Sequence, residues 1–300
     1  MHAALSAQPQ GTAWLVCTGA LTNAALLFAI YPALRAHIRG LTIMGGAVGN
    51  FFTHAALGRT RAHLLLSAAL AQTLPAGLPA GASPAEGAAL LRQHALLRGA
   101  SAALTDAQLA PLVAAARRSY GNSSDAAEFN VYSDPEAAAA LLADGVLAPR
   151  CTLVPLDVTH QVLATAAVLR VVRGGTVPTS RVRALFVEIL VFFARTYEEE
   201  FGMADGPPLH DPLALVAALW PPLFDDNGGE RFEVTVVRDG GTKTEGEDEA
   251  GREGECGRTV VKMLERGAEG VRIPRTLNID AFWCLIDLAL SVAERKGGMD

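Results

Sequence analysis

The chain has 300 residues; 50% of them are hydrophobic, 19% are charged, and the net charge is −6. A chain of this length and composition can bury a sizeable core, as one large or two small domains. Because it contains no basic tract and no alternation of basic and aromatic residues, a nucleic-acid partner is not expected.

The cysteines indicate a reducing compartment. Cys17, Cys151, Cys256 and Cys284 have neither CxxC nor zinc-finger spacing. Three of the four lie in or beside apolar runs, which favours buried, reduced thiols in a cytoplasmic protein.

The stretch from residue 3 to residue 34 carries no charged side chain, so a membrane anchor is one interpretation of it. The stretch also contains Gly19, Asn23 and Pro32 and has no basic n-region. These features favour a buried strand, turn and helix, and no membrane partner is expected.

The first elements in chain order form a βαβ unit. Trp14 to Cys17 is a short apolar run that predicts a buried parallel strand. A helix is expected from about Thr22, with Leu26, Leu27 and Ile30 on its apolar side, and a second strand from Leu41 to Met44 precedes a glycine-rich turn. Such a unit places a ligand site at the carboxyl ends of its strands.

Residues 51–121 are rich in Ala and Leu and are interrupted by a Pro/Gly segment at 75–84. Helices are plausible at residues 61–71, 85–97 and 105–118. The low complexity of the middle of this segment suggests a helical excursion or a disordered linker.

The segment from Asn122 to Gly145 is the most informative part of the chain. Its second half predicts a helix, capped by Ser133 or Asp134 and ended by Gly145. In its first half, polar side chains cluster around one aromatic residue, and no capping requirement accounts for all of them. They either face a ligand or form a solvated loop with an Asx-turn; these side chains belong to Asn122, Asp125, Glu128 and Asn130.

The remaining elements continue the α/β pattern. A buried strand is expected from Cys151 to Leu156, with Asp157 and other polar residues at its carboxyl end. Helices, strands and a hairpin with an acidic Gly-rich loop at residues 239–257 follow. The predicted helices span residues 161–172, 180–200, 213–219 and 279–295, and the predicted strands span residues 232–237, 258–263 and 271–273.

Four motifs in register carry a family resemblance. They are VCTGALTN at residues 16–23, IMGGAVGN at 43–50, AEFNVYSDPEAA with the adjoining VPLDVTHQ, and PLHDPLA at 208–214. Together they resemble the inosine-uridine preferring nucleoside hydrolases. The resemblance implies a single α/β domain over residues 1–300, with an open, mostly parallel, doubly wound, Rossmann-like sheet. Relative to that family, residues 51–121 are an Ala-rich insertion.

The resemblance also implies an activity: hydrolysis of the N-glycosidic bond of purine and pyrimidine ribonucleosides, in nucleoside salvage, by a calcium-dependent homo-oligomer. Glycosidic cleavage needs a positioned nucleophile, fixed negative charge and protonation of the leaving group. Calcium takes about six to eight oxygen ligands. By position, the backbone carbonyl of Thr18 and the carboxylate of Asp211 match calcium ligands.

Other positions match substrate contacts of the family. His210 corresponds to the group that hydrogen-bonds or protonates the departing base. Asp157 corresponds to a supporting residue, and Tyr197 lies close to a position that contacts the base. The positions that resemble ribose contacts, or the apolar wall beside the sugar, are Met44, Asn122, Glu128 and Asn130.

Each position also has a simpler interpretation. Thr18 could only end a strand, Asp211 could only cap the helix that follows it, and Met44 could be an ordinary core residue. His160 is expected to be structural rather than catalytic. The register shared by the four motifs favours the sugar site.

One motif of the family is missing. The family carries Asp-x-Asp-x-Gly-x-Asp-Asp after its first strand, whereas the first acidic residue here is Glu86 and the first aspartate is Asp106. Without those carboxylates, residues 1–300 are expected to be inactive and to lack the first strands of the sheet, so that Trp14 to Cys17 exposes an edge. The abrupt start favours a truncated copy. The alternative is a non-catalytic protein that binds nucleosides or ribose, or that acts through subunit interactions.

Overall fold

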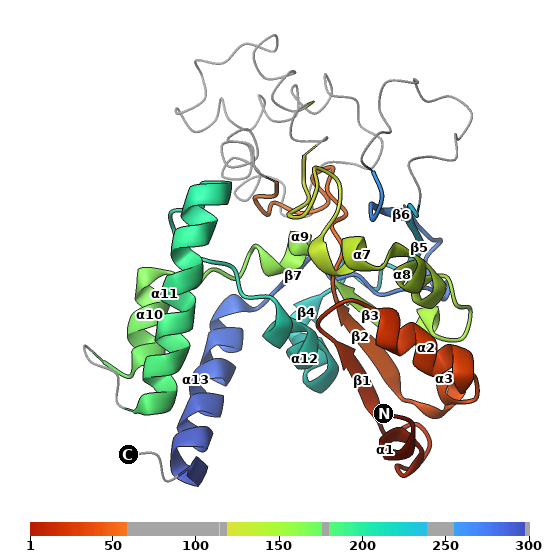
Figure 1. Ribbon diagram of the computed structural model, residues 1–300, viewed down its shortest axis with the longest axis horizontal. Helices are drawn as coiled ribbons and strands as arrows, with labels where there is room; N and C mark the ends of the chain where they lie inside the picture. The colour runs from red at the N-terminus through yellow and green to blue at the C-terminus, as the bar shows by residue number, and fades with distance from the viewer. Residues whose placement is uncertain (59–113, 115–118, 176–179, 239–254, 298–300) are drawn as a thin grey trace.

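The computed structural model describes residues 1–58, 114, 119–175, 180–238 and 255–297 (Figure 1). Its centre is a parallel sheet of β1 (Trp14–Cys17), β2 (Gly40–Met44) and β3 (Cys151–Val154), in the order β1-β2-β3. Val16 pairs with Thr42, and Thr42 pairs with Thr152. The predicted βαβ unit is confirmed, and in the described part of the chain β1 lies at an edge of this sheet.

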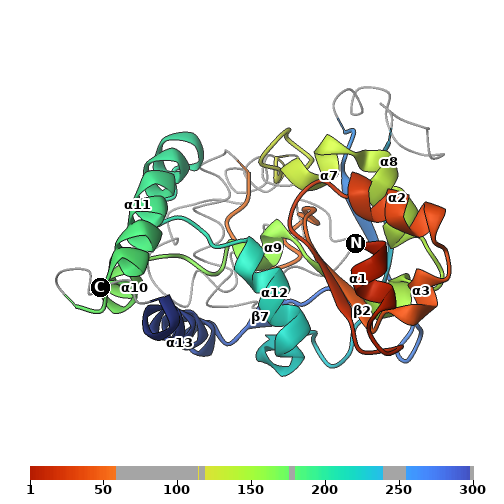
Figure 2. The same ribbon diagram turned by 60° about the horizontal axis from the view of Figure 1, so that its bottom comes forward.

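The period-2 alternation of β2 divides the core between the two faces of the sheet. Leu41 and Ile43 pack against α1 (His2–Ser6), α2 (Thr22–Ile30) and α8 (Pro135–Leu142). Met44 packs on the other face with Ala214 of α12 (Asp211–Leu219). Figures 1 and 2 show α2 and α8 on one side of the strands and α12 on the other. The doubly wound α/β prediction is therefore confirmed.

Backbone hydrogen bonds continue the sheet beyond β3. The N–H of Leu153 donates to the carbonyl of Arg272, and the N–H of Arg272 donates to the carbonyl of Cys151, both at 2.9 Å. Val271 and Phe232 exchange two further bonds of 2.9 Å. These link β3 to the predicted hairpin, which consists of β5 (Phe232–Val236) and β6 (Thr259–Met263). A separate antiparallel pair is formed by β4 (Phe224–Asp225) and β7 (Thr276–Leu277).

Three helices lie side by side at the end of the molecule away from α3 (Leu34–His37): α10 (Ala166–Arg173), α11 (Arg181–Phe201) and α13 (Ile279–Gly297) (Figure 1). Arg183 of α11 is 4% exposed and joins all three. Its guanidinium donates to the Val172 carbonyl at 2.7 Å, to Asp287 at 2.7 Å and to Glu294 at 3.0 Å.

Several predicted boundaries differ from the structure. β3 ends at Val154 rather than Leu156, because Pro155 leads directly into α9 (Leu156–Thr159). The next helix begins at Ala166 rather than Gln161, because the Thr165 side chain caps it by accepting from the N–H of Val168. Two short 3-10 turns also occur, at Ala148–Arg150 and Pro221–Leu223.

The predicted apolar side of α2 was partly wrong. Leu27 is buried as expected, but Leu26 and Ile30 are 54% and 63% exposed. Ala24 and Phe28 face the core instead. The helix is apolar on nearly every side, so its sequence could not indicate which side is buried.

Both ends of the Ala-rich segment belong to the core. Phe51, Phe52, Leu57 and Tyr120 are each at most 7% exposed. The helices predicted at residues 61–71, 85–97 and, apart from residue 114, 105–118 lie outside the described residues, as do residues 239–254 of the acidic loop.

In the part of the chain that is described, no helix combines the length and apolar character needed to cross a membrane. The four cysteines are free; Cys151 is buried as expected, whereas Cys284 is exposed, contrary to the expectation of buried thiols.

Candidate functional site

The carboxyl ends of the three parallel strands meet at one edge of the sheet, where α/β proteins bind ligands. Thr18 follows β1, the turn from Gly45 to Asn50 follows β2, and Pro155 follows β3. Figures 1 and 2 both show the loop after β1 beside the N-terminal end of α12, which starts at Asp211. The topology therefore brings Thr18, Met44 and Asp211 to the same edge.

Glu128 is 2% exposed and is held by backbone donors. Its carboxylate accepts from the N–H of Asn130 at 2.8 Å and of Val131 at 3.1 Å, which caps α7 (Phe129–Ser133). It also accepts from the N–H of Gly46 at 2.8 Å. Burial raises the pKa of this carboxyl, although the three N–H groups favour its charged form.

Gly46 allows this contact through its backbone conformation. Its φ of +79° is in the left-handed region, which favours glycine. A Cβ at Gly46 would lie 2.9 Å from the hydroxyl oxygen of Thr259. The IMGGAVGN motif is thus explained by the close packing of its turn.

Asn122 and Asn130 also bind the backbone. The side-chain oxygen of Asn122 accepts from the N–H of Phe129 at 2.9 Å. The side-chain amide of Asn130 donates to the Met44 carbonyl at 2.9 Å and lies 3.3 Å from the Met44 sulfur. Capping thus accounts for part of this polar loop, since Glu128 caps α7, but the side chains of Asn130 and Asp125 make other contacts. In the second half of the segment, Asp134 caps α8 as predicted, by accepting from the N–H of Ala137 at 3.0 Å.

His210 is hydrogen-bonded through both ring nitrogens. Its Nε2 lies 2.6 Å from the Tyr197 hydroxyl, and its Nδ1 lies 2.8 Å from the Thr159 hydroxyl. The ring of His160 lies 5.5 Å from that of His210. Burial, reinforced by His160, lowers the pKa of His210 to about 3, so its imidazole is neutral at pH 7. Burial also raises the pKa of Tyr197.

His160 has a structural contact, as expected. Its Nδ1 lies 2.7 Å from the Ala56 carbonyl. His160 thereby joins α9 to the segment that follows the glycine turn.

Asp211 lies at the start of α12 but does not cap it. The N-cap residue is His210, no side chain caps this helix, and Pro212 occupies its first turn. The capping interpretation of Asp211 is therefore wrong. Its side chain is exposed to solvent, partial burial raises its pKa, and its charge acts on Glu128. The structure thus brings Asp211, His210, Tyr197 and Glu128 together, with Thr18 exposed nearby after β1.

The side chain of Asp157 holds the turn after β2 through hydrogen bonds to its backbone. It is fully buried and accepts from the N–H of Val48 at 2.8 Å and of Gly49 at 3.0 Å. Its backbone carbonyl accepts from the Thr53 hydroxyl at 2.6 Å. Burial raises the pKa of Asp157 to about 6.

The residues in this region do not fit a calcium ion by themselves. Among the residues that the structure describes, no group of three or more His, Cys, Asp or Glu side chains could hold a metal ion. Asp211 and the Thr18 carbonyl supply few of the about six to eight oxygen ligands that calcium takes. The carboxylate of Glu128 is already occupied by three backbone N–H groups.

Two residues of the site were given little or no importance in the sequence-based prediction. Thr159 was noted only among the polar residues after β3, and Tyr197 was placed near a base-contacting position. The structure joins both to His210. Polar residues at the carboxyl end of a parallel strand were the available signal for Thr159.

Fold and site together define an α/β protein whose hydrogen-bonding side chains converge at the carboxyl edge of a parallel sheet. The family model described as inosine-uridine preferring nucleoside hydrolase matches residues 1–284. The chain therefore belongs to the inosine-uridine preferring nucleoside hydrolase family.

Curated proteins are similar to more than half of this chain. A protein of Schizosaccharomyces pombe described as uncharacterized is 30% identical over 239 residues, which are 80% of this chain and 49% of that protein. The uridine nucleosidase of Saccharomyces cerevisiae is 33% identical over 175 residues, which are 56% of this chain and 48% of that enzyme. The chain thus spans about half the length of the curated relatives it matches.

Solved structures support the same fold. The purine-preferring ribonucleoside hydrolase from Gardnerella vaginalis superposes with a TM-score of 0.59 at 18% identity, covering 97% of this chain and 63% of that one. A plant nucleoside hydrolase superposes with a TM-score of 0.59 at 20% identity, covering 96% of this chain and 64% of that one.

Proposed function

We propose that the protein acts in the hydrolysis of the N-glycosidic bond of ribonucleosides to ribose and free base. Residues 1–300 supply the part of the site that binds the nucleoside, and on their own they do not catalyse turnover. The observation that carries this proposal is the hydrogen-bonded chain of Thr159, His210 and Tyr197 beside Asp211, at the carboxyl edge of the sheet. Relatives named uridine nucleosidase and inosine-uridine preferring nucleoside hydrolase are consistent with the substrate class.

The direction of the hydrogen bonds among Thr159, His210 and Tyr197 suits a departing base. A neutral imidazole has one N–H and one acceptor nitrogen. If the Thr159 hydroxyl donates to Nδ1 of His210, then Nε2–H donates to the Tyr197 oxygen, and the Tyr197 O–H is free to donate onward. A departing base gains electron density as its bond to the sugar breaks, so a donor held in place stabilises that transition state. Tyr197 is thus the residue closest to the base in this proposal, and His210 and Thr159 position it.

The other side of the site is short of acid and base groups. Asp211 has an exposed carboxylate and is available to sugar hydroxyls. Glu128 and Asp157 are at most 2% exposed and are bound to backbone N–H groups. With Asp211 assigned to the sugar hydroxyls, the described residues of the site leave no second free carboxylate to take a proton from water as a general base. This shortage also favours the second candidate function, a non-catalytic nucleoside- or ribose-binding protein.

The same proposal places the protein in the cytoplasm, in the salvage of bases from nucleosides. The four free cysteines support a reducing compartment.

The test is calorimetric titration of the 300-residue chain with inosine, uridine and ribose, together with an assay for released reducing sugar. We expect nucleoside binding without release of sugar, and a loss of about tenfold in nucleoside affinity for Tyr197→Phe. Asp211→Asn should weaken ribose and nucleosides alike. Tyr132→Phe is the matched control, because Tyr132 is an exposed tyrosine on α7.

Two results would overturn the proposal. If no nucleoside binds at millimolar concentration, the site is not a nucleoside site. If the wild-type chain releases ribose, it has a general base that the described residues do not provide.

A further inference from the structure

A cavity of about 600 Å³ lies at the amino ends of the parallel strands. Trp14 begins β1, Arg39 immediately precedes β2 and Arg150 immediately precedes β3, and all three residues line the cavity. Other lining residues come from α12, from the 3-10 turn that follows it and from β4. We refer to this space as the amino-edge cavity.

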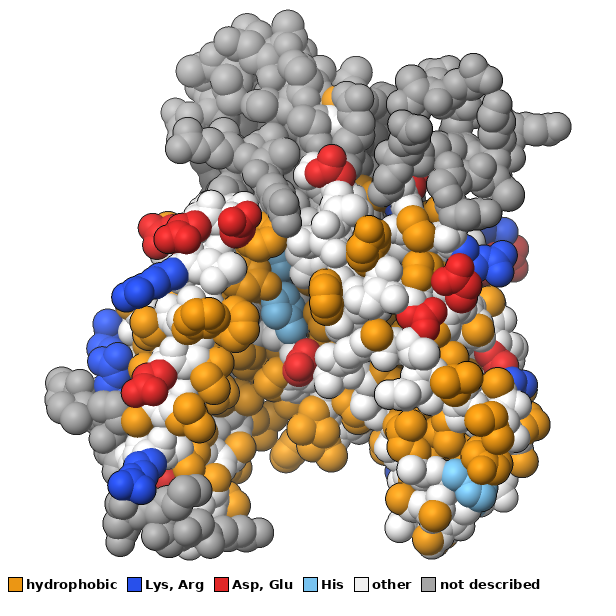
Figure 3. Space-filling view, viewed as in Figure 1, with side chains coloured by type: hydrophobic (Ala, Val, Ile, Leu, Met, Phe, Trp, Pro, Cys, Tyr) orange, Lys and Arg blue, Asp and Glu red, His pale blue; other side chains and the backbone are white. Residues whose placement is uncertain are grey.

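The amino-edge cavity lies at the opposite end of the strands from the candidate nucleoside site. That site lies beyond the carboxyl end of β2, and β2 spans about 13 Å from Gly40 to Met44 at about 3.3 Å per residue. Figure 3 shows histidine side chains in a hollow beside α11, the helix whose Tyr197 contacts His210. A ligand in the amino-edge cavity would therefore leave the candidate nucleoside site open.

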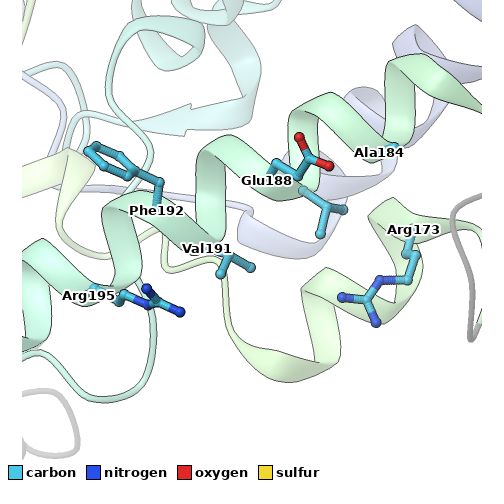
Figure 4. A pocket seen from close by; sticks show the side chains of 7 residues that line it. Arg173, Ala184, Glu188, Val191, Phe192 and Arg195 are labelled. Carbon is cyan, nitrogen blue, oxygen red and sulfur yellow. The ribbon is translucent and has the colours of Figure 1, made fainter.

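The lining of the amino-edge cavity is strongly basic. It contains four arginines and one carboxylate, that of Asp226, so it has an excess of three positive charges in a chain whose net charge is −6. Another cavity, of about 460 Å³ between α10 and α11, has Arg173, Arg195 and Glu188 among apolar side chains (Figure 4). Its excess is a single positive charge, so the amino-edge cavity is the better suited of the two to an anion. The four arginines of the amino-edge cavity are Arg39, Arg150, Arg231 and Arg272.

Asp226 holds two of these arginines in place. Its carboxylate accepts from Nη1 of Arg231 and from Nε of Arg272, both at 2.9 Å. Nη2 of Arg272 donates to the Phe224 carbonyl at 2.8 Å. Within the described residues, Nη1 of Arg272 is buried and has no hydrogen-bond partner. This guanidinium is therefore fixed in position and still has a donor for the oxygen of an anion.

The other two arginines are exposed to solvent. Nη1 of Arg150 donates to the carbonyls of Ala36 and Ile38, both at 3.1 Å, which fixes Arg150 beside the end of α3. Arg39 takes part in none of the ion pairs within the described part of the chain. The charge of Arg39 is therefore available to a ligand.

Trp14 gives the cavity an aromatic wall. A Cβ at position 40 would overlap the Trp14 ring, so Gly40 is what allows the ring to lie against the start of β2. Pro149, Pro221 and Pro222 add further uncharged surface to the lining. The flat ring can pack against a sugar or a base while the arginines meet a charged group.

We propose that the amino-edge cavity binds a phosphate monoester of a sugar or a nucleoside. The planar guanidinium group matches pairs of phosphate oxygens. A phosphate monoester carries about −1.5 to −2 charges at pH 7, which the excess of arginines neutralises. Cavities of about 300–1,000 Å³ hold small organic ligands, so the space exceeds what inorganic phosphate fills. The phosphate group lies at the arginines, and the sugar or base packs against Trp14.

The test is calorimetric titration of the 300-residue chain with uridine 5′-monophosphate, ribose 5-phosphate, inorganic phosphate and succinate. We expect at least one of the two esters to bind at submillimolar concentration, and about threefold or more tightly than inorganic phosphate or succinate. Arg39→Gln should weaken that ester about tenfold, because it removes a charge-assisted contact. Arg195→Gln, at an exposed arginine of the cavity in Figure 4, is the matched control and should leave ester affinity unchanged. Circular dichroism of both variants checks that they fold.

Competition separates this cavity from the candidate nucleoside site, because uridine 5′-monophosphate also contains a nucleoside. Saturating uridine should leave ester binding intact, and Arg39→Gln should leave uridine affinity unchanged. Ribose 5-phosphate and succinate carry no base, so this proposal and the nucleoside proposal fail or succeed separately.

Either preference between the two esters supports the site and identifies its ligand as a nucleotide or a sugar phosphate. Absence of ester binding at millimolar concentration would overturn the proposal, as would equal binding of succinate or inorganic phosphate. Displacement of both esters by uridine, or full ester affinity in Arg39→Gln, would place the ligand elsewhere and would overturn it too.

Discussion

The carboxylate of Glu128 accepts a hydrogen bond of 2.8 Å from the N–H of Gly46, 82 residues earlier in the chain. The same carboxylate caps α7. One side chain thus fixes the turn after β2 to the start of the helix that follows the polar loop. Two of the motifs shared with the family are held together by this contact.

Glu128→Ala should destabilise the protein by about 2–4 kcal/mol, because it leaves three backbone N–H groups without their acceptor. Glu128→Gln keeps one oxygen and should lose about 1 kcal/mol. The measurement is urea unfolding followed by circular dichroism, with Glu136→Ala on the surface of α8 as a control near zero. A loss of ribose binding with unchanged stability for Glu128→Ala would show that Glu128 faces the sugar rather than bracing the turn.

Short-range patterns in the sequence predicted most elements of the fold. The strands appear where expected at Trp14 to Cys17 and near Phe232 and Arg258. Their sequences are apolar runs or alternate between apolar and polar residues, and these patterns predict buried strands directly. The link between β3 and β5 through Val271 and Arg272 could not be predicted, because backbone pairing across such distances leaves no local signal.

The candidate site was harder to predict in its details. The strand order predicted a ligand site at the carboxyl edge of the sheet, and the family resemblance assigned Thr18, Met44 and Asp211 to it; the parallel topology brings Thr18 and Met44 to that edge. That Glu128 and Asn130 bind backbone groups could not be inferred, because a polar side chain near a helix start looks the same whether it meets a ligand or an N–H. Tyr197 reaches His210 only through the packing of α11.

Asp157 should make the stability of the protein depend on pH in a particular direction. Its pKa is raised to about 6 from an ordinary value of 3.8, so the folded state holds the proton more tightly than the unfolded state. Its contribution to stability is therefore present below about pH 4, falls as the pH rises towards 6, and is lost above that, by on the order of 3 kcal/mol.

Comparison with Asp157→Asn isolates this effect. The variant has no charge at this position, so its unfolding free energy relative to wild type should improve between pH 4 and pH 7, on top of a constant cost for the lost acceptor. Urea unfolding at pH 4, 5, 6 and 7 provides the measurement. Parallel pH profiles for the two proteins would mean that Asp157 titrates normally in the fold.

Arg183→Met should cost about 2 kcal/mol and loosen the packing of α10, α11 and α13. The change removes five hydrogen bonds from the guanidinium, one each to Val172, Glu294 and Ser291 and two to Asp287. The cost is kept below that of a fully buried pair because the Asp287 side chain is 40% exposed and water can replace part of its contact. Arg181→Met, at an exposed position of the same helix, should change stability by less than about 0.5 kcal/mol. Equal effects of the two substitutions in thermal unfolding would show that Arg183 does not hold the three helices together.

Calcium should leave the stability of this chain unchanged. A ligand that binds only the folded state raises the free energy of unfolding in proportion to the logarithm of its concentration over its Kd. Asp211 and the Thr18 carbonyl offer too few oxygens for a tight site, and Glu128 is already bound to backbone donors.

Adding 5 mM calcium chloride should therefore move the melting temperature by less than about 1 °C, the same as for Asp211→Asn and for a magnesium control. A shift of several degrees that is specific to calcium and disappears in Asp211→Asn would show that Asp211 gathers further oxygen ligands around an ion. In that case the shortage of metal ligands inferred from the described residues would be wrong, and the chain would hold more of the hydrolytic site than its carboxylates indicate.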